Sequence, residues 1–200
     1  MNKNLHLSLY HYLRNMIFQL NWKQELTNVT DDFKKSFGTL NNKQLNWKPA
    51  PNKWSIAQVV DHLIHTNDSY IPVIQNLNSQ KRNVPITGRF DFLVNYFGDF
   101  IFKGVEPTRT KKIKTFPVWE PGSSDLPETI INKFVESQQR IISTIEKNKD
   151  KFNAVISSPA NKYVVYKFGK AVDILIMHGK RHYNQALEVQ AMLNERVIKV

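Results

Sequence analysis

Apolar residues recur every three or four positions along most of this chain, which is the spacing of an amphipathic helix. The pattern predicts four long helices, covering residues 26–40, 56–77, 124–145 and 168–195. The first of them could begin well before Trp22. Four long helices with one long crossover favour an all-α four-helix bundle.

Local signals mark where some of these helices begin and bend. Ser55 is a good N-cap for the second helix, because its hydroxyl can accept a backbone N–H of the first turn. Pro72 lies inside the second helix and should kink or shorten it. Pro127 and Glu128 suit the first turn of a third helix that starts near Ser124.

Residues 81–122 break the helical pattern with several prolines and glycines, so we expect a long irregular crossover between the second and third helices. Within it, apolar residues from Phe90 to Ile101 predict one short amphipathic helix. A connection of this length in a small domain is more often a lid or a binding loop than a bare tether.

The N-terminal stretch Leu5–Leu20 is partly apolar, but His6, His11 and Arg14 interrupt it and no small-residue cleavage site follows. We therefore interpret it as a helical extension rather than a signal peptide. No apolar run is long enough to cross a bilayer, so no membrane contact is expected. The chain is predicted to be one cytoplasmic domain over residues 1–200.

The net charge of +11 raises the question of nucleic acid, yet basic residues are scattered over every segment. The one modest cluster contains Lys103, Arg109, Lys111, Lys112 and Lys114. A solvated loop explains it better than a nucleic-acid site, and attraction of an anionic small substrate is an intermediate hypothesis. Cysteine is absent, which excludes disulfides, thiolate metal sites and cysteine nucleophiles.

The most informative residues are His178 and His182, which lie in the middle of the apolar stripe of the last helix. Side chains four residues apart in a helix lie one above the other, so both rings can reach one metal ion. Imidazole suits zinc and its first-row neighbours. The alternative is a pair of core histidines hydrogen-bonded to backbone carbonyls.

A third ligand must come from another helix, and His62 is the best candidate because it lies at the edge of the apolar stripe of the second helix. His65 lies further towards solvent and could line a pocket mouth. His6 and His11 have no comparable context and are interpreted as surface residues. Gln58 and Gln185 could support a ligand or simply pack between helices.

Other chemistries find little support in the sequence. Glycine-rich phosphate loops and a GxSxG elbow are missing, and Gly179 stands where a zinc protease of the HExxH type needs glutamate. Asp61 and Asp68 point away from the side of His62, so neither is proposed as a general base. Trp54 is expected to pack the start of the second helix. Trp119 is expected to anchor the long loop, with a position over the metal site as the alternative.

Two motifs carry a family resemblance. Leu45-Asn46-Trp47-Lys48-Pro49 followed by Lys53–Leu63, and the late run His178–Gln185, resemble the signatures of the DinB-like (DinB/YfiT) superfamily. The resemblance covers the chain from about Trp22 to its end. It implies a four-helix bundle with a three-histidine metal site, whose ligands here would be His62, His178 and His182.

Function follows from the same resemblance. Similar proteins include transferases and isomerases that use low-molecular-weight thiols such as bacillithiol or mycothiol, so the leading hypothesis is a thiol S-transferase acting on a small molecule. A metal-dependent hydrolase and a non-catalytic, metal-stabilised binding protein are the alternatives. Zinc or nickel is the expected metal, with iron as a third choice, and the resemblance also allows a homodimer.

Overall fold

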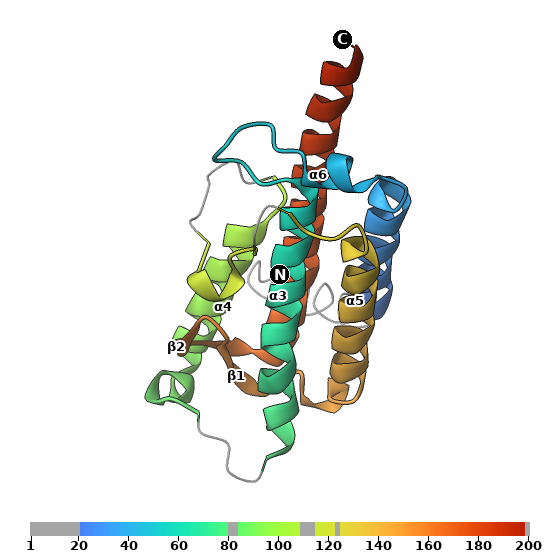
Figure 1. Ribbon diagram of the computed structural model, residues 1–200. Coiled ribbons are helices and arrows are strands. Elements are labelled where there is room, and N and C mark those ends of the chain that lie inside the picture. The colour runs from blue at the N-terminus through green and yellow to red at the C-terminus, as the bar shows by residue number, and fades with distance from the viewer. Residues whose placement is uncertain (1–20, 80–83, 109–114, 123–124, 199–200) are drawn as a thin grey trace, which may run out of the picture.

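The computed structural model describes residues 21–79, 84–108, 115–122 and 125–198, which are mostly helical with one small two-stranded sheet (Figure 1). The helices are residues 21–37, α2 (Asn42–Asn46), α3 (Ile56–Gln75), α4 (Asp91–Val105), α5 (Ile130–Glu146) and α6 (Phe168–Ile198). Strands β1 (Val155–Ser158) and β2 (Asn161–Lys167) form the sheet. Single 3-10 turns are η1 (Asn76–Asn78), η2 (Ile86–Arg89), η3 (Pro117–Trp119) and η4 (Lys149–Lys151).

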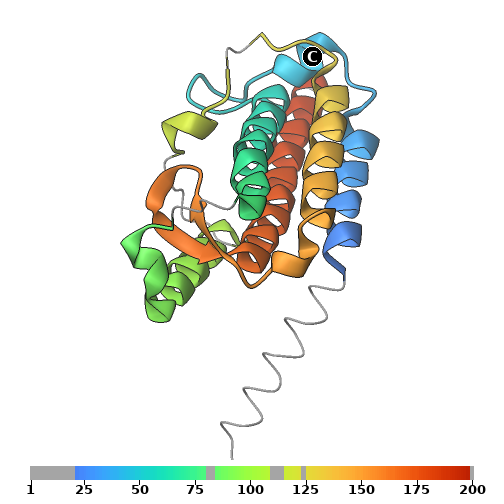
Figure 2. The ribbon, with the colours of Figure 1, turned by 90° about the horizontal axis from the view of Figure 1, so that it is seen from below.

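The helix of residues 21–37 lies side by side with α3, α5 and α6, and α4 and the strands lie outside this group (Figure 2). Apolar faces of all four helices meet in a common core. Phe33 is fully buried there, with its ring 4.9 Å from that of Phe134 and 5.4 Å from that of Tyr183. The periodicity of the sequence therefore correctly identified the faces that pack together.

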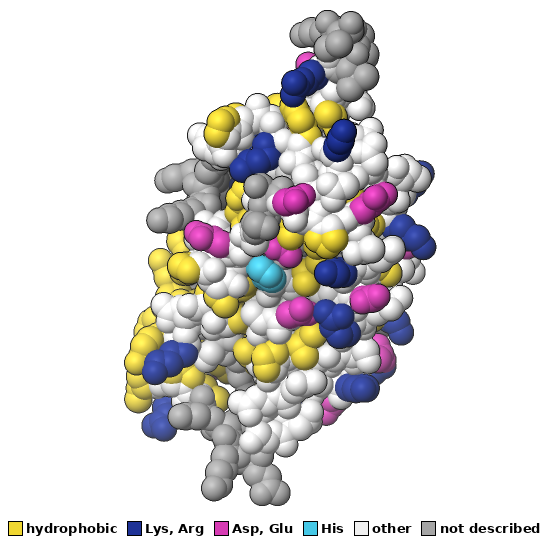
Figure 3. Space-filling view, in the orientation of Figure 1, with side chains coloured by type: hydrophobic (Ala, Val, Ile, Leu, Met, Phe, Trp, Pro, Cys, Tyr) yellow, Lys and Arg dark blue, Asp and Glu magenta, His cyan; other side chains and the backbone are white. Residues whose placement is uncertain are grey.

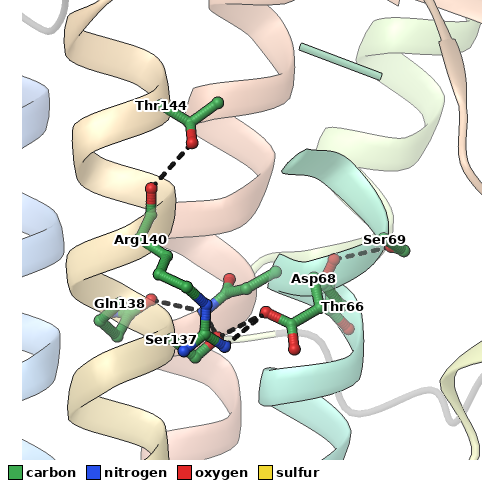
Figure 4. A network of polar contacts seen from close by, with 8 residues as sticks. Thr66, Asp68, Ser69, Ser137, Gln138, Arg140 and Thr144 are labelled. Atoms are coloured by element: carbon green, nitrogen blue, oxygen red, sulfur yellow. Dashed lines mark hydrogen bonds and ion pairs between the residues drawn. The ribbon is translucent and has the colours of Figure 1, made fainter. Parts of the chain in front are cut away.

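Polar side chains fix how α3 and α5 align. Inside the core, Asn67 Nδ2 donates to Gln138 Oε1 at 2.8 Å, and Gln138 Nε2 donates to Thr30 Oγ1 at 3.1 Å. Nearer the surface, Asp68 accepts from Arg140 at 2.9 Å and from Ser137 Oγ at 3.3 Å (Figure 4). Because buried polar groups need partners, these bonds favour one alignment of the two helices.

The second helix starts where the sequence predicted. Ser55 and Gln58 form a reciprocal capping box, in which each side chain accepts a backbone N–H of the other residue. The helix continues through Pro72 and ends at Gln75, two residues before the predicted end.

Two predictions about secondary structure were wrong. The third long helix begins at Ile130 rather than near Ser124, because Asn46 and Asn42 hold the backbone of Leu126 outside it: Leu126 N–H donates to Asn46 Oδ1, and both asparagine amides donate to its carbonyl. The chain is also not all-α. The run Val155–Ser158 pairs antiparallel with Asn161–Lys167, whose β-branched and aromatic residues favour strands.

Some predictions fall outside the described residues. These include the helical extension before Trp22 with His6 and His11, and the basic residues from Arg109 to Lys114. The short helix within the crossover is confirmed as α4. Among the residues that the structure describes, no helix is both long enough and apolar enough to span a membrane.

A buried tyrosine pair joins the hairpin to α3. The hydroxyl groups of Tyr70 and Tyr166 lie 2.6 Å apart, and both side chains are almost completely buried. Burial raises the pKa of Tyr70 well above its ordinary value, and it also raises the pKa of Tyr166. Each phenol is therefore held in its neutral form by the fold.

This pair predicts a loss of stability at high pH. The folded chain binds the two phenol protons more tightly than the unfolded chain, so the contribution is complete below about pH 10 and declines as the pH rises further. We expect the free energy of unfolding in urea to fall less between neutral and strongly alkaline pH in Tyr70→Phe/Tyr166→Phe than in the wild type. Equal losses in the two proteins would contradict this expectation.

Candidate metal centre

Three histidine rings meet between α3 and α6. His62 Nε2 lies 3.1 Å from His178 Nε2, and His182 Nε2 lies 3.0 Å from the same atom. His62 and His182 are buried, and His178 is partly exposed. Four ligands around zinc, at zinc–nitrogen distances of about 2.0–2.1 Å, stand about 3.3 Å apart. Two of the three nitrogen–nitrogen distances are therefore close to what a metal requires, and all three ligand atoms lie within 4.8 Å of one another.

Packing of the helices brings the rings together. His178 and His182 are one turn apart on the inner side of α6, and His62 faces them from α3. Between the two α6 histidines, a Cβ atom on Gly179 would lie only 2.9 Å from Val29 Cγ1. The glycine thus lets α6 approach the helix of residues 21–37 closely at the turn that carries the ligands.

Two hydrogen bonds determine which nitrogen of the ring carries the proton. His62 Nδ1 lies 2.6 Å from the carbonyl oxygen of Trp119, and His182 Nδ1 lies 2.8 Å from Gln185 Oε1. A carbonyl oxygen can only accept, so in both neutral rings Nδ1 is protonated and Nε2 presents a lone pair. This is the tautomer that metal-bound histidines adopt through such outer contacts.

The surroundings keep the rings neutral. Burial lowers the pKa of His62, and it lowers the pKa of His178 and of His182 well below the ordinary value, with further lowering from the neighbouring rings. Lone pairs of His62 and His182 both point at His178 Nε2, which could donate a proton to only one of them. A divalent cation at the centre would satisfy all three.

A short segment, residues 119–122, holds His62 in place, and we call it the strap. Besides accepting from His62, Trp119 donates its indole N–H to Ser69 Oγ at 2.9 Å. His65 Nδ1 donates to the carbonyl oxygen of Glu120 at 3.1 Å, and the N–H of Gly122 donates to Asp61 Oδ2 at 2.7 Å. The strap is thus fastened along one side of α3.

Trp54 closes the site from the start of α3. Its ring is stacked on His182 at 6.2 Å between centroids and lies 5.1 Å from the ring of His62. The sequence pointed to a packing role at the helix start, but the structure puts this indole against two of the three histidines. A neighbouring aromatic surface lowers the local dielectric and supports the neutral form of the rings.

The residues predicted to support the site have different positions. Gln185 contacts His182 directly. Gln58 belongs to the capping box of α3 and reaches the strap at the Gly122 carbonyl, 3.5 Å away, rather than a ring. His65, with its side chain 41% exposed, lies on the strap rather than among the three rings. The roles of Trp119 and Trp54 at the rings were missed, because no side-chain pattern reveals them.

Comparison with known proteins identifies the family of this chain. The model of the DinB superfamily matches residues 25–186, which include all three histidines. The chain belongs to the DinB superfamily. Neither the curated proteins nor the solved structures contain a significant match. The geometry of the site in this DinB-superfamily chain is therefore known only from its own structure.

The strap makes a specific prediction about Asp61. Removing its carboxylate in Asp61→Ala should loosen Gly122 and with it the Trp119 carbonyl that orients His62, so that affinity for Zn²⁺ falls about tenfold. Asp68→Ala is the matched control, because Asp68 lies on the same helix but pairs with Arg140 of α5. Calorimetric titration of both variants with Zn²⁺ measures the difference, and equal affinities would contradict the role of the strap.

Proposed function

We propose that this DinB-superfamily chain is an enzyme that holds one divalent metal ion through Nε2 of His62, His178 and His182. The supporting observation is the convergence of three buried or partly buried imidazoles, two of which carry the proton on Nδ1 and so present the lone pair of Nε2 to the third ring. We further propose that the helix of residues 21–37, α3, α5 and α6 form the four-helix bundle that the resemblance implies. Zinc or nickel fits the nitrogen-only ligand set best.

The site favours an anionic cosubstrate. Three neutral imidazoles do not offset the charge of a divalent cation, and Arg181 adds positive charge close enough to lower the pKa of His178 and His182. When bound, a divalent cation lowers the pKa of a coordinated thiol or water and supplies a nucleophile at neutral pH. The chain contributes a largely buried site with positive charge from Arg181 nearby, a setting that would stabilise a thiolate.

The polar partners favour thiol transfer over hydrolysis. In the described part of the chain, the hydrogen bonds of the three rings go to one another, to a backbone carbonyl and to an amide oxygen. Asp61, the carboxylate next to His62, is engaged by the N–H of Gly122. Hydrolysis by activated water usually employs a positioned general base, whereas a thiolate needs none. The proposed activity is therefore S-transfer from a low-molecular-weight thiol to an electrophilic carbon.

Metal binding is tested first with tag-free protein. We expect about one equivalent of metal in the wild type and in Asp68→Ala, and its loss in His62→Ala, His178→Ala and His182→Ala. Asp68→Ala is the matched control, since this residue lies on α3 but pairs with Arg140 of α5 and contacts neither the rings nor the strap. Elemental mass spectrometry gives the content. No metal in the wild type after reconstitution with Zn²⁺, Ni²⁺ or Fe²⁺ would contradict the proposal.

The same proteins should differ in thermal stability. A ligand at a hundred times its Kd stabilises the folded state by about 2.7 kcal/mol, which corresponds to roughly 5–10 °C in Tm for a chain of this size. We expect this rise on addition of Zn²⁺ for the wild type and Asp68→Ala only. Such a shift also in His178→Ala would place the metal elsewhere.

Activity is tested with metal-loaded protein, a panel of thiols including bacillithiol, mycothiol and cysteine, and 1-chloro-2,4-dinitrobenzene as electrophile. A carbon–sulfur bond forms, chloride leaves and the thiol proton passes to solvent. We expect turnover with at least one thiol and none in His178→Ala. Ester or amide cleavage without thiol turnover would favour the hydrolase alternative, and neither activity would favour the non-catalytic one.

A further inference from the structure

Helix α4 carries an aromatic stripe on its outer side. Phe92, Tyr96 and Phe100 are 68%, 61% and 61% exposed. They are four residues apart, so they point in nearly the same direction over about 12 Å of helix. Hydrophobic side chains gather over this helix at the left edge of Figure 3, with basic side chains beside them. Exposure of three large rings in one line needs an explanation.

The opposite side of α4 already packs against the rest of the molecule, so the exposed rings do not belong to the hydrophobic core. Val94 is 1% exposed, and a Cβ atom on Gly98 would lie 3.0 Å from Lys170 Cγ and 3.3 Å from Tyr166 Cβ. The helix is thereby held tightly against β2 and α6. Its orientation is fixed from behind, and the aromatic stripe faces away from the molecule.

The size of the apolar surface bears on what could cover it. Ile86 and Phe90, just before the helix, are 62% and 48% exposed and extend the stripe. Since an aromatic side chain offers about 150–250 Å², the five side chains together expose on the order of 600 Å². That is the upper end for a monomer surface, yet it is less than the roughly 800 Å² that each partner contributes to a standard protein interface.

The charge of the protein distinguishes between a second copy of the chain and an anionic surface as what covers the stripe. The exposed basic residues of α4 and of η2 and β2, which pack against it, are Arg89, Lys103, Lys162 and Lys167. The exposed acidic residues of α4 are Asp91 and Asp99, the latter paired with Lys170 at 3.0 Å. The chain as a whole carries +11. A second copy would bring the same excess charge to the contact, whereas an anionic surface would be attracted to it.

We propose that α4 docks this protein onto an anionic lipid bilayer, with the helix parallel to the surface and the rings of Phe92, Tyr96 and Phe100 inserted at the headgroup level. The helix lies at an outer corner of the molecule, where a flat surface can reach it (Figure 2). The lack of a spanning helix does not oppose this, because an interfacial helix lies on the membrane and needs no spanning run.

The test is flotation of the full chain with phosphatidylcholine vesicles, with and without phosphatidylglycerol. We expect binding only with phosphatidylglycerol, and weaker binding as salt rises. Phe92→Ser/Phe100→Ser should lower the affinity at least about tenfold, because two rings lose their apolar burial. Met192→Ser is the matched control: this side chain on α6 is 49% exposed but lies outside the stripe.

The variants should keep the circular dichroism spectrum and the metal content of the wild type, since α4 supplies none of the three histidines. A change in flotation can then be separated from a failure of the metal site or of folding. Failure to float with phosphatidylglycerol, or equal flotation of the wild type and the double variant, would overturn the proposal. A lipid-independent dimer that Phe92→Ser/Phe100→Ser abolishes would assign the stripe to a second copy instead. If single-stranded DNA displaced the protein from the vesicles, and Phe92→Ser/Phe100→Ser weakened its binding to the DNA, the stripe would be assigned to nucleic acid instead.

Discussion

The hydrogen bond from His62 Nδ1 to the carbonyl oxygen of Trp119 connects the crossover segment to the chemistry of the core. It stabilises the tautomer that carries its proton on Nδ1, which leaves Nε2 free to bind a metal. The carbonyl in turn is positioned by the strap, through Ser69 on one side and Asp61 on the other. An irregular segment, remote in sequence from the α6 histidines, thereby determines whether the site can form.

The fold makes this arrangement durable by placing the ligands on rigid elements. Two histidines share one turn of α6, and the third faces them from α3, whose alignment with α5 is fixed by Asn67 and Gln138. Burial keeps the rings neutral, and the Nε2 lone pairs of His62 and His182 both meet Nε2 of His178, which could donate to only one of them. The three rings cannot all be satisfied by hydrogen bonds to one another, and this is the physical basis for proposing a metal.

Much of this could be predicted because it is encoded in side-chain periodicity. The capping residue Ser55, the start of α6 at Phe168 and the shared face of His178 and His182 all follow from patterns of three and four. The strap could not be predicted, because its contribution is a backbone carbonyl, which every residue has. The late start of α5 was missed for a similar reason: distant asparagines bind the backbone of Leu126.

The central claim is that the fold brings Nε2 of three histidines to one point, with the lone pairs of His62 and His182 directed inward, before any metal binds. Long-range nitrogen–proton NMR correlation on the metal-free protein tests it most directly, because it reports which ring nitrogen of each histidine carries the proton. The account predicts neutral rings with the proton on Nδ1 in His62 and His182 at neutral pH. Protons on Nε2 in these residues, or charged rings, would contradict it.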